Sequence, residues 1–216
     1  LAYAALRETS IDSPAPNYAR GGAIAISLLD TSLELMNTTF EANEVRTLET
    51  FSADSSAGGF GAEISIRSGE DGALVMDSVT VRDSIAAVRY LDGTQDARVW
   101  TTVVDVVQPE FNAGAIDVTV RASLFEDLPR VGFHIASGPF TESNVDIGEG
   151  TVFRNCELIW LETDGVWLDD CTFIGTRVFT RGSVSNSSFE RIFSTANASA
   201  LEMRYGGTIY ACTFHQ

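Results

Sequence analysis

Apolar and polar residues alternate in short bursts along most of the chain. Examples are Leu33-Glu34-Leu35, Ile64-Ser65-Ile66, Val118-Thr119-Val120 and Val166-Trp167-Leu168. A period of two is typical of half-buried β-strands. Clusters of Gly, Asp, Asn and Ser, as at residues 68–72, separate the bursts, and helical periodicity is nearly absent. The pattern therefore predicts an all-β fold of short strands and turns.

The bursts also resemble one another. Leu35-Met36-Asn37-Thr38-Thr39-Phe40 matches residues 168–173, 184–189 and 209–214. Each copy has an aliphatic residue, then Asn, Asp or Ala two positions later, then Ser or Thr, and Phe five positions after the aliphatic residue. The last three copies start 16 and 25 residues apart, and weaker copies lie at residues 76–79 and 120–125. Internal repeats of this length predict a solenoid.

The length of the repeat indicates which solenoid to expect. Roughly 16–25 residues hold about three short strands and their turns, which make one coil of a right-handed single-stranded parallel β-helix. Equivalent residues then stack about 4.8 Å apart. We expect an interior aliphatic column, an aromatic stack, and a bend column where Asn and Asp tolerate the left-handed conformation. The aliphatic column contains Leu35, Leu168, Val184 and Ile209. The aromatic stack contains Phe40, Phe125, Phe173, Phe189 and Phe214. The bend column contains Asn37, Asp170 and Asn186.

We predict one β-helical domain over residues 20–216, with about six to eight coils. Longer spacings in the first half indicate inserted loops, for example at residues 46–57. Residues 1–19 are a candidate N-terminal cap, as a short helix or strand. The chain starts at Leu1 without Met or a basic signal-peptide start, which suggests processing or excision. Only two residues follow the motif at 209–214, so we expect further residues or a neighbouring subunit to continue the last coil.

Two tetrapeptides carry a resemblance to a known family. Gly21-Gly22-Ala23-Ile24 and Phe40-Glu41-Ala42-Asn43 resemble the paired tetrapeptides of polymorphic outer membrane proteins and of autotransporter-like β-helical passengers. Gly61-Ala62 with Ile64, and Gly114-Ala115-Ile116, resemble degenerate copies of the first element. The resemblance covers roughly residues 20–216 and implies a surface-exposed passenger that serves in adhesion or as a stalk.

The charge balance narrows the classes of partner. The chain has 30 acidic and 14 basic residues, a formal charge of −16. Such a surface repels nucleic-acid phosphates and anionic lipids. No run approaches the roughly 18 apolar residues of a membrane-spanning helix. We therefore expect neither nucleic-acid binding nor membrane insertion of this segment, and no cofactor, with Ca²⁺ kept open as a counter-ion.

The cysteines and histidines do not form a recognisable metal or disulfide pattern. Cys156, Cys171 and Cys212 are too few for a disulfide framework, and no Cys-x-x-Cys occurs. If the repeat alignment holds, Cys171 and Cys212 occupy equivalent positions two coils apart, too far for a disulfide. His134 and His215 have no metal-ligand spacing around them. The redox state of the thiols stays open.

Enzymes also use β-helices, so catalysis has to be weighed. A glycoside hydrolase needs two placed carboxylates, and Asp169-Asp170 near Glu162 and Asp164 is the closest match. Asp170, however, occupies the bend column, and no basic partner accompanies the acids. His134 lies alone in a strand-like stretch. We predict no catalytic residue, and a polysaccharide lyase or glycoside hydrolase remains the alternative.

Two groups of surface residues remain. Trp100, Trp160 and Trp167 could stack against sugars or pack under loops, and both readings stay open. Sequons start at Asn37, Asn186 and Asn197; the bend column explains the first two, so Asn197 is the candidate for glycosylation. Together, the sequence predicts an extracellular or cell-surface structural or adhesive module. Its expected partners are a cell-surface glycan or protein, or further copies stacked end to end in a filament.

Overall fold

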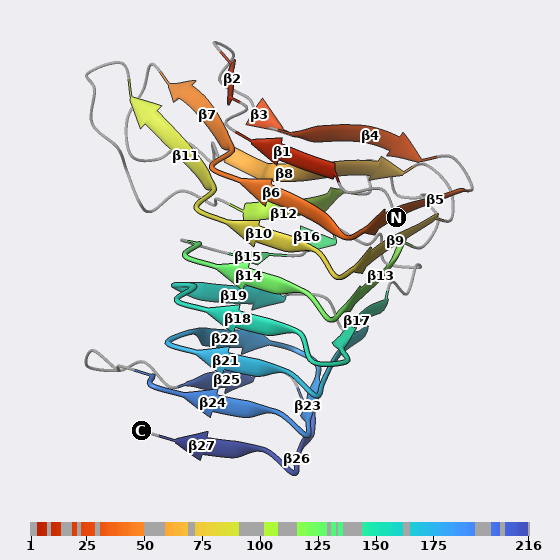
Figure 1. Cartoon of the computed structure of the whole chain (residues 1–216), viewed down its shortest axis with the longest axis vertical. Coiled ribbons are helices and arrows are strands. Elements are labelled where there is room, and N and C mark those ends of the chain that lie inside the picture. Colours follow the sequence, from red (N-terminus) through yellow and green to blue (C-terminus); the bar gives the residue numbers. More distant parts are fainter. Residues whose placement is uncertain are drawn as a thin grey trace.

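A computed structural model shows a stack of coils in which every paired strand runs parallel to its neighbour (Figure 1). The structure describes residues 4–7, 10–13, 19–20, 23–28, 31–49, 59–68, 72–90, 102–107, 116–128, 131–132, 134–135, 144–161, 165–192, 200–203 and 206–215. Within these ranges there is no helix, and hence none with the length and apolar character needed to cross a membrane. The predicted class, an all-β parallel solenoid, is confirmed.

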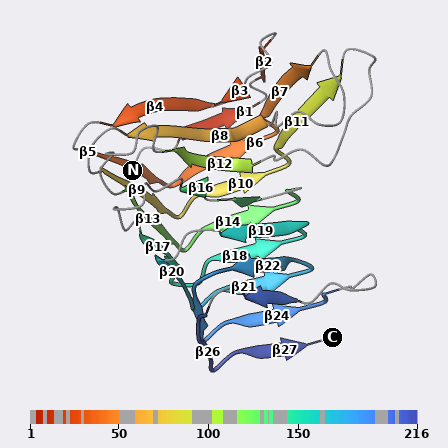
Figure 2. The ribbon, with the colours of Figure 1, turned by 180° about the vertical axis from the view of Figure 1, so that it is seen from behind.

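Two long sheets run the length of the stack (Figures 1 and 2). The first sheet has eight strands, so eight coils cross it: β1 (Ala4–Arg7), β6 (Thr38–Glu41), β10 (Thr80–Arg82), β14 (Leu124–Glu126), β18 (Val152–Arg154), β21 (Thr172–Ile174), β24 (Ser188–Glu190) and β27 (Thr213–His215). The second sheet has seven: β5 (Thr31–Met36), β9 (Gly72–Asp77), β13 (Ile116–Arg121), β17 (Asn144–Gly148), β20 (Gly165–Asp169), β23 (Ser183–Ser185) and β26 (Ile209–Tyr210).

Shorter sheets form the third side of the coils. In the first half of the chain these strands are β2 (Ser10–Ser13), β7 (Glu44–Glu49) and β11 (Ile85–Tyr90), and then β3 (Ala19–Arg20), β4 (Ile24–Leu28), β8 (Gly59–Ser68), β12 (Thr102–Val107) and β16 (His134–Ile135). In the second half they are β15 (Val131–Gly132), β19 (Leu158–Leu161), β22 (Arg177–Thr180) and β25 (Leu201–Met203). The candidate cap, residues 1–19, contributes strands β1 and β2 and part of β3.

The coils are longer in the first half of the chain than in the second. Equivalent residues are 41 positions apart between Leu35 and Met76, but only 16 apart between Leu168 and Val184. The difference lies on the third side, because the first two sheets keep a continuous register throughout. The second half is therefore the more compact part of the stack, with little chain between one sheet and the next.

Residues with positive φ make the two bends that flank the first sheet, one per bend except for Glu149 and Gly150 between β17 and β18. Asn37, Asp170 and Asn186 have φ of 49°, 54° and 48° at the bend that enters it. Ser78, Ala122 and Ala211 hold the same bend in other coils. At the bend that leaves the sheet, the residues are Ala42, Asp83, Asp127, Asn155, Gly175 and Arg191. One left-handed residue changes the chain direction while its backbone N–H still bonds the next coil, as from Asn186 to the Tyr210 carbonyl (3.0 Å).

The residue after each bend points inward and carries a small polar group in most coils. Ser187 Oγ donates to the Ser185 carbonyl (2.7 Å) and accepts the N–H of Cys171 in the neighbouring coil (3.1 Å). At the second bend, Thr176 Oγ1 does the same for the Ile174 carbonyl and the Cys156 N–H (3.0 and 3.1 Å). These hydroxyls give the buried N–H groups of Cys171 and Cys156 an acceptor.

The core consists of ladders of stacked side chains. The aromatic stack runs through Phe125, Phe153, Phe173, Phe189 and Phe214, with neighbouring ring centroids 4.7–5.4 Å apart. Val81 separates Phe40 from this run. The aliphatic column runs in register through Leu35, Met76, Val120, Ile147, Leu168, Val184 and Ile209.

The last coil departs from the expectation that the columns are interior throughout. Ile209 is 51% exposed and Phe214 is 54% exposed, whereas their column neighbours Val184 and Phe189 are buried. β26 and β27 each have a paired strand on one side only, and no described residues cover Ile209 and Phe214 on the other side, whereas Leu35 at the opposite end of the aliphatic column is buried.

Oppositely charged side chains form a ladder on the outer side of the first sheet. Glu41, Arg82, Glu126 and Arg154 follow one another in register from β6 to β18. Arg82 Nη2 lies 2.6 Å from Glu41 Oε1, and Arg154 Nη1 lies 2.8 Å from Glu126 Oε1. Because opposite charges on neighbouring strands favour this pairing and like charges oppose it, the ladder helps to define the register of the coils.

Candidate ligand-binding surface

Two large aromatic side chains project from the outer side of the second sheet. Trp167 on β20 is 57% exposed and Tyr210 on β26 is 68% exposed. Strand alternation explains both, since Val166 and Leu168 point into the core and Trp167 between them points outward. Tyr210 likewise follows Ile209 of the aliphatic column. The two aromatic rings therefore share one face of the sheet.

Short polar side chains surround Trp167 on this face. Asp146 of β17 and Ser183 of β23 are its direct cross-strand neighbours. Asp169 follows two positions along β20 and points to the same side. Tyr210 is offset from Trp167 by two strands and two residues, which places the two Cα atoms about 12 Å apart at about 4.8 Å per strand and 3.3 Å per residue.

Hydrogen bonds orient the carboxylate of Asp169. Ser185 Oγ donates to Asp169 Oδ1 (2.6 Å), and Asn186 Nδ2 donates to the same oxygen (2.8 Å). These two bonds lower the pKa of Asp169 below its ordinary value, Ser185 contributing most. No donor among the described residues reaches Oδ2 of Asp169. The side chain is therefore an ionised, oriented acceptor with one oxygen available to a ligand.

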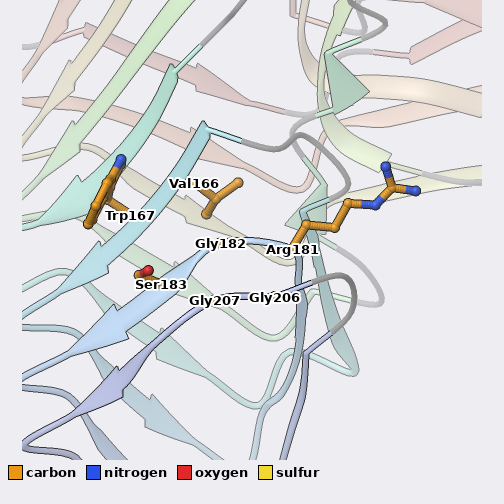
Figure 3. A pocket seen from close by; sticks show the side chains of 7 residues that line it. All are labelled: Val166, Trp167, Arg181, Gly182, Ser183, Gly206 and Gly207. Atoms are coloured by element: carbon orange, nitrogen blue, oxygen red, sulfur yellow. The ribbon is translucent and has the colours of Figure 1, made fainter.

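A hollow of about 810 Å³ borders this surface, and Figure 3 shows its lining. Val166, Trp167, Arg181, Gly182, Ser183, Gly206 and Gly207 line it. In Figure 3 the side chain of Arg181 extends away from Trp167. Three of the lining residues are glycines, and a Cβ on Gly182 would lie 2.0 Å from the Val166 carbonyl oxygen. The absence of side chains at these positions both lets the coils stack closely and keeps the hollow open.

Of the acids considered for catalysis, the structure describes Asp169 and Asp170. Asp169 lies on the outer face of β20, whereas Asp170 is an exposed bend residue with φ of 54°. Glu162 and Asp164 lie outside the described residues. His134 is on β16, opposite Asp105 of β12, and His215 is exposed on β27. Among the described residues, no three His, Cys, Asp or Glu side chains come together to hold a metal ion.

The structure describes only some of the other surface residues singled out from the sequence. Trp100, Asn197, Gly21, Gly22, Gly114 and Ala115 lie outside the described residues. Trp160 is on β19, and only its backbone is described. Of the other sequons, Asn37 and Asn186 are both bend residues with positive φ.

The three cysteines are free. Burial raises the pKa of Cys156 and of Cys171 to about 12, and the neighbouring Asp170 and Asp169 add to the effect at Cys171. Each thiol donates to backbone carbonyls, Cys171 Sγ to that of Ile147 (3.2 Å), much as the hydroxyls do in other coils. Ser187 lies between Cys171 and Cys212 in the column. The thiols thus occupy structural positions after the bends.

Sequence reasoning missed several of these positions. The second bend does have a sequence signal, since Phe153-Arg154-Asn155-Cys156 and Phe173-Ile174-Gly175-Thr176 share a pattern with Phe40-Glu41-Ala42-Asn43. The same pattern adds Phe153 to the aromatic stack. The signal for Tyr210 on the face of Trp167 is its place directly after an inward aliphatic residue.

The fold and this surface define a parallel β-helical solenoid with an aromatic and acidic outer face. Comparison of the chain with protein-family models, with curated proteins and with solved structures found no match. The resemblance to polymorphic outer membrane proteins and autotransporter-like passengers therefore remains a prediction.

Proposed function

We propose that this chain is a structural and adhesive module of an extracellular or cell-surface protein and that it does not catalyse a reaction. The observation that carries the proposal is the open, aromatic outer face of the second sheet, supported by coils that stack in continuous register. Trp167 and Tyr210 expose large apolar areas there, and such areas on soluble proteins commonly mark interaction sites. A rigid stack holds this face in one geometry.

The state of Asp169 also favours binding over hydrolysis. A glycosidase needs one carboxyl group whose pKa is raised, so that it can act as a general acid near neutral pH. Two hydrogen bonds lower the pKa of Asp169 instead and keep it ionised. The alternative function, a carbohydrate-active enzyme, would have to use other residues.

Continuation of the last coil, by further residues of a longer chain or by a second copy stacked end to end, is a further part of the proposed role. Ile209 and Phe214 present column residues on the uncovered side of β26 and β27. Edge strands of this kind recruit another strand unless they are covered. A second copy stacked on this side would extend both columns.

Binding and turnover measured on the same preparation test the proposed function. We expect the immobilised chain to retain intact cells or arrayed glycans, and to release neither reducing ends nor unsaturated uronates from polysaccharides. Turnover that survives further purification would overturn the proposal in favour of the enzyme. Failure to retain any cell or glycan would contradict adhesion and leave only the structural role.

A further inference from the structure

We propose that the outer face of β20, β23 and β26 binds a chain of uncharged sugars, which stack on Trp167 and Tyr210 and hydrogen-bond to Asp169. The inference rests on the proposed adhesive role and names the class of ligand. We call the residues Trp167, Asp169, Ser183, Ser185 and Tyr210 the Trp167 surface.

The aromatic side chains match the shape of a pyranose ring. A sugar presents a flat patch of C–H groups, which packs on an exposed aromatic ring, while its hydroxyls point sideways. Ser183 is the direct neighbour of Trp167 and has a short side chain, so it leaves room beside the indole. Gly182, Gly206 and Gly207, which precede β23 and β26, line a hollow next to this surface (Figure 3).

The polar groups supply the directional contacts that sugars require. Oδ1 of Asp169 is engaged by Ser185 and Asn186, and Oδ2 faces no donor among the described residues. A carboxylate oxygen in this state accepts hydrogen bonds from sugar hydroxyls, and such bonds to an ionised group are stronger than neutral ones. Asp169 lies two residues from Trp167 on the same face, within the reach of one stacked sugar.

The charges favour an uncharged chain. Asp146 and Asp169 lie close to Trp167, and the whole chain carries a formal charge of −16. Uronates and sulfated sugars would bring further negative charge to this surface. Two arginines lie nearby. The side chain of Arg181 points away from Trp167 in Figure 3. Arg121 Nε lies 3.6 Å from Glu149 Oε1, which offsets its charge. Neutral sugars avoid this repulsion.

The separation of the two aromatic rings predicts a dependence on ligand length. Trp167 and Tyr210 lie about 12 Å apart, farther than a single sugar reaches. One sugar would therefore stack on Trp167, and only a longer oligosaccharide would also reach Tyr210.

Calorimetric titration with cellobiose, cellohexaose, mannohexaose and polygalacturonate tests the proposal. We expect at least one neutral hexasaccharide to bind and polygalacturonate not to bind. Trp167→Ala should weaken hexasaccharide binding at least about tenfold. Met36→Ala is the matched control, because Met36 is a similarly exposed apolar residue (55%) on the outer side of β5, far along the same sheet. Tyr210→Ala should weaken hexasaccharide binding and leave cellobiose binding unchanged.

Several outcomes would overturn this assignment. They are an equal loss of hexasaccharide affinity in Trp167→Ala and Met36→Ala, binding of polygalacturonate alone, or no binding of any neutral oligosaccharide in the panel. Retention of intact cells by the Trp167→Ala chain at the unaltered level would place adhesion elsewhere. In that case the assignment of sugar binding to the Trp167 surface is wrong, while the adhesive role stands. If the unaltered chain retains no cells, the adhesive role itself is contradicted.

Discussion

At the residue scale, each coil depends on bends made by one residue in the left-handed conformation. Asn and Asp adopt it at low cost, but Ala122 and Ala211 hold it as well, with φ of 45° and 51°. The position that follows carries a small polar group in most coils, and a Ser or Thr hydroxyl there accepts a backbone N–H of the preceding coil. Cysteine is small enough for the same position and donates its thiol to backbone carbonyls there, so cysteines appear without forming disulfides.

The aromatic stack gives the first prediction. Phe173 is fully buried between Phe153 and Phe189, so Phe173→Ala should leave a cavity and lower the free energy of unfolding by about 3–5 kcal/mol. Phe214→Ala is the control, because Phe214 is half exposed and should cost clearly less. Urea unfolding of both variants measures the difference. A loss below about 1 kcal/mol for Phe173→Ala would mean that the stack does not support the core.

The buried thiols give a prediction about alkaline stability. In the unfolded chain Cys171 ionises at its ordinary pKa, but in the folded chain its pKa is about 12. Between these two values the unfolded state binds fewer protons, so the stability present at lower pH should decline as pH rises through this window. Cys171→Ser, which places a hydroxyl as at Ser187, should reduce the decline. Urea unfolding at about pH 8 and about pH 11 gives the change in the free energy of unfolding for each chain. The same change in the unaltered chain and in Cys171→Ser would contradict the contribution of this thiol to the pH dependence.

At the scale of elements, close approach of consecutive coils shapes the region around the Trp167 surface. Gly182 lies against the Val166 backbone, and Gly207 lies against the Gly182 backbone. Side chains at these two positions would push apart the segments that lead into β20, β23 and β26. The strands that present Trp167, Ser183 and Tyr210 therefore depend on glycines that contribute no chemistry of their own.

Gly182→Ala tests this dependence. The new Cβ would lie 2.0 Å from a backbone oxygen that cannot rotate away, so we expect a loss of about 3 kcal/mol or more in the free energy of unfolding. Gly150→Ala is the comparison, because Gly150 has open space around it and its cost comes from φ of 79° alone, about 1–2 kcal/mol. Thermal or urea unfolding ranks the two variants. Equal losses would show that coil contact at Gly182 is unimportant.

At the scale of the whole molecule, stacking is a repeated nearest-neighbour interaction. Each coil is covered by the coils on its two sides, and in the described structure β26 and β27 are covered on one side only. The half-exposed Ile209 and Phe214 mark that surface. Solenoids bury such a surface with a cap, with another repeat or with another molecule.

Substitutions at two neighbouring residues of β26 distinguish end-to-end association from association through other surfaces. We expect light scattering to show association that rises with concentration, and Ile209→Lys should suppress it by placing a charge in the aliphatic column. Tyr210→Lys is the matched control, because Tyr210 is exposed on the outer face of the same strand and should leave stacking intact. A chain that stays monomeric at high concentration, or equal suppression by both variants, would contradict association through this surface.

The repeat pattern was sufficient to predict the fold class and much of the core register. Every coil repeats the same local requirements, namely an inward aliphatic residue, a bend residue and a phenylalanine, so Leu168, Asp170 and Phe173 could be aligned with Val184, Asn186 and Phe189 without a structure. A solenoid is favourable to such reasoning because each coil contacts mainly its neighbours.

Contacts on the outer faces of the coils required the structure. The charge ladder of Glu41, Arg82, Glu126 and Arg154 joins residues up to 44 positions apart, since coils of unequal length bring them into register. Sequence spacing does not reveal this ladder, because the length of the third side differs from coil to coil, and that length sets which outward residues become neighbours. The repeat alignment does place Asp169 beside Ser185 and Tyr210, but only the structure shows that Ser185 and Asn186 both donate to one oxygen of Asp169.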